Sequence, residues 1–166
     1  MSLSIRIATP EDAPAVDALM KRSYGRLLKD DYPAEILIAA LPLMARANPK
    51  LLASGTYFLV EDDADGLLGA GGWTPTAPGD MPNTPGLGHI RHVATDDRAV
   101  RRGVGRMILE RCIAEAKAAG LERLEALSTL TAVAFYEAMG FEDIEPVAVP
   151  MGPHVMLPSI RMLRAL

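Results

Sequence analysis

One stretch of the chain constrains its fold more than any other: Ala99 to Gly120, AVRRGVGRMILERCIAEAKAAG. Its later part repeats apolar residues at helical spacing and ends in Gly120, which is typical of a helix closed by a C′ glycine. Ahead of that helix stand Gly103, Gly105 and three arginines, and the segment before them, 89–95, is predicted to be a strand. The sequence therefore predicts a strand, a glycine-rich turn and a long helix in succession.

The start of this helix suits an anion. The first four backbone N–H groups of a helix lack intrahelical partners, and the helix dipole adds partial positive charge there. Glycines let an anion approach those groups, and Arg101, Arg102 and Arg106 add charge. The turn matches neither G-x-x-x-x-G-K-S/T nor G-x-G-x-x-G, which disfavours a nucleotide-hydrolysing P-loop and a Rossmann site. The stretch is either a diphosphate cradle or a glycine-containing turn with solvated arginines.

Strands and helices alternate along the rest of the chain. Hydrophobic periodicity predicts helices from Pro10, over 34–47 with a break or bend near Pro42, over 101–120 and over 132–140. Strands are predicted over 4–8, 56–62, 66–73, 89–95 and 121–127, and within 141–149 and 157–163. The strand–helix–strand order over 89–149 implies an α/β layer with some parallel pairing.

Length, charge and cysteine usage limit the class of protein. At 166 residues the chain is expected to form one domain over residues 1–166. A net charge of −4 argues against a nucleic-acid partner, because neutralising phosphates needs a basic surface. No apolar run is long enough for a spanning helix and the N-terminus lacks a secretory signal, so no membrane association is expected. Cys112 is the single cysteine, which favours a reducing cytoplasm.

Two motifs in this order resemble the GNAT superfamily of acetyl-CoA-dependent N-acetyltransferases. VRRGVG, 100–105, is similar to the family pattern Q/R-x-x-G-x-G/A, with Val100 in place of Gln or Arg. STLTAVAFYEAMGFE, 128–142, is similar to N-x-x-A-x-x-F/L-Y-E-x-x-G-F, with Thr129 in place of Asn. The resemblance implies an α/β (α+β) fold: a mixed, mainly antiparallel sheet of six or seven strands, splayed after the fourth strand and flanked by about four helices. It also implies acetyl-CoA as cosubstrate, no metal, and a final strand that in many relatives contributes to a homodimer.

The resemblance further implies where acetyl-CoA would bind. The acetyl carbonyl is expected near the backbone N–H of Val93, with Ala94 and Thr95 flanking the pantetheine arm. Together with the glycine-rich turn and the second motif, the expected cofactor-binding residues are Val93, Ala94, Thr95, Arg101, Arg102, Gly103, Val104, Gly105, Arg106, Thr129 and Tyr136.

Two residues are candidates for proton transfer. Tyr136 stands where many relatives carry a tyrosine beside the coenzyme sulfur; a phenol with a pKa of about 10 can donate to the leaving thiolate. The alternative is a packing aromatic. His89 is a candidate base for the amine, because an imidazole titrates near neutral pH, and the alternative is a structural histidine. His92 should face the other side of a regular strand, unless a bulge breaks the alternation.

The acceptor pocket is expected between the first two helices and the facing strand ends. The candidate substrate-binding residues are Tyr24, Asp31, Tyr32 and Trp73, with Arg26, Asp30 and Thr74 beside them. The leading function is transfer of an acetyl group from acetyl-CoA to a primary amine by direct attack in a ternary complex. The alternative is a non-catalytic acyl-CoA-binding sensor or scaffold, which Val100 and Thr129 favour.

Overall fold

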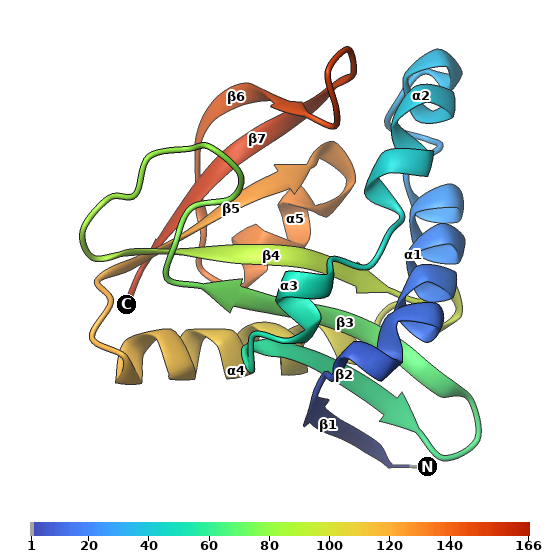
Figure 1. Cartoon of the computed structure of the whole chain (residues 1–166), viewed down its shortest axis with the longest axis horizontal. Helices are drawn as coiled ribbons and strands as arrows, with labels where there is room; N and C mark the ends of the chain where they lie inside the picture. The colour runs from blue at the N-terminus through green and yellow to red at the C-terminus, as the bar shows by residue number, and fades with distance from the viewer. Residues whose placement is uncertain (1) are drawn as a thin grey trace.

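Seven strands form one mixed sheet in the computed structural model, which describes residues 2–166 (Figure 1). The strands are β1 (Leu3–Ile7), β2 (Tyr57–Asp62), β3 (Gly66–Thr74), β4 (Leu87–Thr95), β5 (Arg123–Thr129), β6 (Glu142–Pro150) and β7 (Met156–Ala165). Their order is β1-β2-β3-β4-β5-β7-β6, and every neighbouring pair is antiparallel except β4 and β5. The predicted mixed, mainly antiparallel sheet is confirmed, and the predicted strand ends agree within two residues.

Helices cover both faces of the sheet. Within the described residues these are α1 (Ala13–Leu27), α2 (Ala34–Met44), the one-turn α3 (Pro49–Leu52), α4 (Val104–Ala118) and α5 (Val133–Ala138), with 3-10 turns η1 (Pro10–Asp12), η2 (Asp97–Ala99) and η3 (Leu130–Ala132). Alternate residues of β2 face opposite sides: Phe58 packs with the α4 cluster and Tyr57 with the α1 cluster. The second predicted helix ends early, at Met44, because Asn48 caps a separate turn at α3. None of the described helices is long and apolar enough to cross a membrane.

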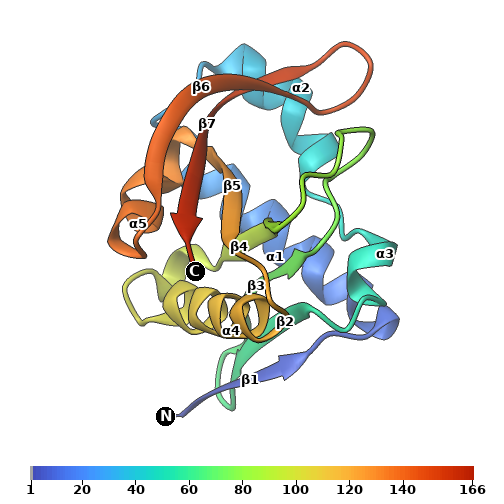
Figure 2. The same ribbon diagram turned by 90° about the vertical axis from the view of Figure 1, so that its left-hand side faces the viewer.

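The sheet opens between β4 and β5. These strands pair only over Leu87–His89 and Arg123–Glu125, and beyond that point they diverge (Figure 1). Figure 2 shows the result: β1–β3 lie in the lower half of the molecule and β5–β7 in the upper half, with β4 between them. The predicted splay after the fourth strand is confirmed.

A β-bulge interrupts β4 beside this opening. Ala70 pairs with Ala94 and Gly72 with Arg91, so three steps along β4 oppose two steps along β3. His92 lies at the bulge with a φ of 46°, in the left-handed region that non-glycine residues rarely adopt. His92 and Val93 therefore lie outside the β3–β4 register, and β5 no longer pairs with the strand at this level.

Glycines in β3 bring α4 close to the sheet. A Cβ added to Gly69 would lie 2.3 Å from Val104 Cγ1, and one added to Gly71 would lie 2.9 Å from Ile108 Cγ2. Side chains at either position would push the helix outward. The start of α4 is thus held next to the end of β4.

Candidate active site

Two cavities meet at the opening between β4 and β5. The larger, about 450 Å³, lies among α1, the end of β4, the turn before α4, and α5; we call it the α4 cavity. The smaller, about 250 Å³, lies among β4, β5 and the ends of β6 and β7; we call it the β5 cavity. Both are lined by the same five residues: Tyr24, Val93, Thr129, Ala132 and Tyr136. A molecule filling one cavity would therefore reach a molecule filling the other.

Every predicted cofactor-binding residue except Arg102 lines the α4 cavity. Gly103 caps α4 with a φ of 83°, and no side chain caps the helix. Met107 N–H donates to Gly103 O at 3.0 Å, so the N–H groups of Val104, Gly105 and Arg106 precede this helical hydrogen bond. These groups and the exposed Arg101 and Arg106 side chains border the cavity, which gives it one electropositive end.

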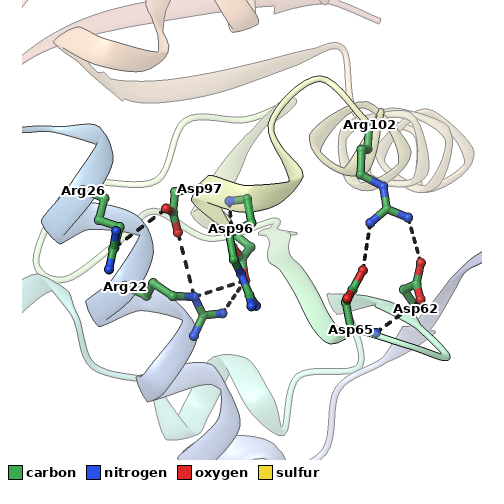
Figure 3. A network of polar contacts seen from close by, with 8 residues as sticks. Arg22, Arg26, Asp62, Asp65, Asp96, Asp97 and Arg102 are labelled. Carbon is green, nitrogen blue, oxygen red and sulfur yellow. Dashed lines mark hydrogen bonds and ion pairs between the residues drawn. The ribbon is translucent and has the colours of Figure 1, made fainter.

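Arg102 lies elsewhere, which corrects its predicted contact with an anion. Its Nη2 is 2.7 Å from Asp62 Oδ2 and its Nη1 is 3.3 Å from Asp65 Oδ2, on the turn between β2 and β3 (Figure 3). Its backbone N–H donates to Ala99 O at 3.1 Å. The hydrogen bond from Arg102 holds the pKa of Asp62 below its usual range. Arg102 therefore anchors the glycine-rich turn to the sheet, a role that spacing alone could not separate from ligand binding.

A second ionic network anchors the other side of the turn (Figure 3). Asp96 is fully buried and accepts hydrogen bonds from Arg98 Nη2 and N–H, both at 2.8 Å, and from Arg22 of α1. Its neighbour Asp97 lies 3.7 Å from Arg26. These bonds, chiefly from Arg98 and then from Arg22, hold the pKa of Asp96 well below its usual range. The turn is thus fixed to α1 as well as to β2–β3.

Two tyrosine hydroxyls hold the β4 bulge. Tyr24 OH, from α1, donates to Val93 O at 3.2 Å. Tyr57 OH, from β2, donates to His92 O at 2.7 Å. Both carbonyls are thus held, and Val93 borders both cavities at a point where it lies outside the β3–β4 and β4–β5 register pairs.

Tyr136 is buried at this junction, with 6% of its surface exposed. Its ring makes edge contacts with Phe135 and Phe141, at centroid distances of 5.2 and 5.4 Å. Burial raises the pKa of Tyr136, so the phenol is protonated at neutral pH. No residue among 2–166 forms a hydrogen bond with the Tyr136 hydroxyl. Packing explains the position of the ring but gives the hydroxyl group no partner.

His89 lines the β5 cavity together with Glu125, which the sequence analysis missed. The parallel register pairs the two residues, and His89 Nδ1 lies 3.2 Å from Glu125 Oε1. His89 is 3% exposed, and its Nε2 has no hydrogen-bond partner in the described chain. His89 and then Arg161 hold the pKa of Glu125 below its usual range. Glu125 could have been found from the sequence as an acidic residue within the otherwise mainly apolar strand 123–129.

Arg91 and His92 also line the β5 cavity. The bulge removes the strand alternation that would have turned His92 to the other face. Burial, with a smaller effect of the Arg91 charge, lowers the pKa of His92 to about 4, so this imidazole is neutral at pH 7. Besides these polar residues, the cavity is lined by the apolar side chains of Leu43, Met44, Val149, Met151 and Leu157.

Of the four candidate substrate-binding residues, Tyr24 alone lines the α4 cavity or the β5 cavity. Trp73 pairs with Ile90 and packs on the α4 face, where its Nε1 donates to Glu115 Oε1 at 3.0 Å. Tyr32 OH donates to Pro158 O at 2.6 Å and accepts from Leu130 N–H at 2.9 Å. Asp31 accepts a hydrogen bond from Thr131 at 2.8 Å. Those three predictions are corrected: Asp31, Tyr32 and Trp73 hold the surrounding structure together.

The described residues contain no cluster of three or more His, Cys, Asp or Glu that could hold a metal ion. Cys112 is fully buried in α4, and burial raises the pKa of its thiol. A buried thiol with a raised pKa is a poor nucleophile.

Solved structures of similar fold are acetyltransferases. A GCN5-related N-acetyltransferase from Rhodopseudomonas palustris has a TM-score of 0.82 and 20% identity, covering 100% of this chain and 97% of that one. The PaiA N-acetyltransferase of Thermoplasma acidophilum, solved in complex with coenzyme A, has a TM-score of 0.73 and 13% identity, covering all of both chains. The fold is that of an acetyltransferase.

Sequence comparison identifies the family. The model of the acetyltransferase (GNAT) family matches residues 21–141. An IAA acetyltransferase of Azospirillum brasilense is 30% identical over 152 residues, which is 89% of this chain and 91% of that protein. The chain belongs to the GNAT acetyltransferase family and is an acyltransferase.

Proposed function

We propose that the protein transfers the acetyl group of acetyl-CoA to a primary amine by direct attack in a ternary complex. The observation that carries the proposal is the meeting of the two cavities at Val93 and Tyr136. The α4 cavity suits the coenzyme, and the presence of coenzyme A in the Thermoplasma structure supports this use. An acyl-CoA sensor or scaffold would need the α4 cavity alone, whereas an enzyme needs room for an acceptor beside it.

The chain's own residues would hold acetyl-CoA at both ends. The N–H groups of Val104, Gly105 and Arg106 would donate to the diphosphate, with Arg101 and Arg106 adding charge. The pantetheine arm would run along Val93–Thr95 toward the sheet opening. The Val93 N–H would donate to the thioester carbonyl oxygen, where negative charge develops during attack.

Two proton transfers complete the reaction. His89 would accept the proton that the attacking amine loses, with Glu125 stabilising the resulting imidazolium. Tyr136 would donate its proton to the departing thiolate, so the products are the N-acetylated amine and free coenzyme A thiol. Return of a proton from His89 to Tyr136, directly or through water, restores the starting state.

The direct test is release of free thiol from acetyl-CoA with a panel of amines. Tyr136→Phe should lower kcat at least tenfold, because general acid catalysis contributes about 10²–10⁴-fold, while the Kd of acetyl-CoA changes little. Tyr32→Phe removes a buried hydroxyl away from both cavities and should keep kcat within about threefold. Wild-type turnover by Tyr136→Phe would show that the tyrosine only packs.

The proposed base has its own test in the pH profile of kcat/KM. His89→Gln should remove the low-pH limb of the profile, and Tyr136→Phe should leave that limb in place. Glu125→Gln should move the limb to lower pH, because a neighbouring carboxylate favours the protonated imidazole. A limb that persists unchanged in His89→Gln assigns the base elsewhere.

A further inference from the structure

The β5 cavity contains a cationic side chain without a counter-ion. Arg91 is half-buried, and its Nη1 lies 3.3 Å from Thr74 Oγ1. A guanidinium has five N–H donors, and this is the single side-chain hydrogen bond that Arg91 makes within residues 2–166. Arg91 forms no ion pair with any described carboxylate. Burial lowers the pKa of Arg91, which reflects the unfavourable removal of an unpaired charge from water.

None of the other ionisable groups that line this cavity forms an ion pair with Arg91. Glu125 is engaged by His89 and by Arg161, whose Nη1 is 3.4 Å from Glu125 Oε2. Arg161 in turn lies 3.0 Å from Glu145. His92 is neutral at pH 7, and Tyr24 and Tyr136 keep their protons because burial raises their pKa. None of these groups forms an ion pair with Arg91, so its guanidinium is available to an anionic group of a bound molecule.

Arg91 is also separate from the end of the site proposed for the coenzyme phosphates. It lines the β5 cavity and not the α4 cavity, whereas Arg101 and Arg106 line the α4 cavity at the start of α4. An anion for Arg91 must then belong to the molecule in the β5 cavity.

The size and lining of the cavity limit that molecule further. Its volume of about 250 Å³ suits a small molecule. The cavity is also lined by the apolar side chains of Leu43, Met44, Val149, Met151 and Leu157. The occupant needs an anionic group and an apolar part.

We propose that the acceptor is a small primary amine that also carries a carboxylate and an apolar remainder, as an apolar α-amino acid does. This inference rests on the proposed acetyl transfer. Arg91 binds the carboxylate through paired N–H groups, the amine lies toward His89 and the junction, and the apolar part contacts Leu43 and its neighbours. A simple alkylamine would bring its positive charge toward Arg91, and a carboxylate offsets this repulsion.

The kinetic test compares L-leucine, L-leucinamide and 3-methylbutylamine, which share one apolar tail and differ in the group beside the amine. After correction for the neutral fraction of each amine, kcat/KM should be about 10- to 100-fold higher for L-leucine, the range expected for a charge-assisted contact. In Arg91→Gln the ratio of L-leucine to L-leucinamide should fall to within about threefold of one. Arg123→Gln removes an exposed arginine outside both cavities and should keep the wild-type ratio.

Binding to the wild-type protein provides a test that needs neither a variant nor turnover. Calorimetric titration of the coenzyme A complex should give a Kd for N-acetyl-L-leucine about 10- to 100-fold lower than for N-acetyl-L-leucinamide. Equal affinities, or a preference for the amide that resembles the start of a peptide, would overturn the carboxylate site even in an active enzyme. Absence of thiol release with every amine, alongside a clear preference for the acid in titration, would instead overturn the proposed acetyl transfer.

Discussion

His92 should make the stability of the protein depend on pH in a range where few other groups titrate. In the folded chain its pKa is about 4, against about 6.5 for an unperturbed histidine. The unfolded chain therefore binds a proton at His92 between these values, while the folded chain does not. The contribution of His92 to stability is complete above pH 6.5 and decreases as the pH falls toward 4.

The size of the effect follows from the two pKa values. At pH 5 the unfolded His92 is almost fully protonated and the folded one is mostly neutral, which favours unfolding by about 2 kcal/mol relative to pH 7.5. His92→Asn removes the titration, and asparagine tolerates the left-handed backbone at this position, where φ is 46°. The variant should therefore escape the acid-dependent loss.

Urea unfolding of both proteins at pH 7.5, 6.5, 5.5 and 5.0 measures this difference. The free energy of unfolding of wild type minus that of His92→Asn should fall by about 2 kcal/mol from pH 7.5 to pH 5. Comparing the two proteins cancels the other titrating groups that they share. Parallel pH curves would refute the reasoning, because they would mean that His92 is as easily protonated in the folded chain as in the unfolded one.

Gly103 in the glycine-rich turn, and Asp96, which anchors the turn, give further predictions. Gly103→Val should weaken acetyl-CoA binding at least about tenfold by calorimetry, because the side chain obstructs the N–H groups at the start of α4. Gly55→Val, at a similar φ of 81° and in equally open surroundings, should leave binding unchanged. Equal acetyl-CoA binding by the two variants would contradict a diphosphate site at these N–H groups. Asp96→Asn should lower the free energy of unfolding by about 3 kcal/mol at pH 7 and Asp97→Asn by less, because Asp96 is the fully buried partner. The deficit of Asp96→Asn should shrink below about pH 4, since the depressed pKa of Asp96 stabilises the fold above that pH and the contribution is lost as the pH falls.

The sequence predicts this fold well because the two kinds of periodicity are clear. The alternation in 4–8 and the helical spacing after Gly103 predicted elements close to those observed. Which face of a strand meets the cavity depends on register, and register is a long-range property. Trp73 and Thr74 necessarily face opposite sides, yet only the pairing of Trp73 with Ile90 places the indole on the α4 face.

The candidate site was predicted less evenly for the same reason. Residues expected to bind through their backbone, such as Gly103 to Arg106, can be predicted from a local motif, and they line the α4 cavity. The partners of charged side chains come from distant segments: Arg102 meets Asp62, and His89 meets Glu125 across two strands. No local pattern specifies such pairs, so Arg91 and Glu125 were missed. Homodimer formation and a cytoplasmic location stay predictions.

The tyrosines that hold the β4 bulge divide the site into a fixed part and an exchangeable part. Val93 is positioned by Tyr24 and Tyr57, which stand on α1 and β2. The apolar wall that would select the acceptor instead comes from α2 and the connection between β6 and β7, through Leu43 and Met151. Substitutions in those two segments should therefore change which acceptor is used and leave the position of Val93 unchanged. A mutant library confined to those two segments should therefore be sufficient to change the acceptor specificity of this fold.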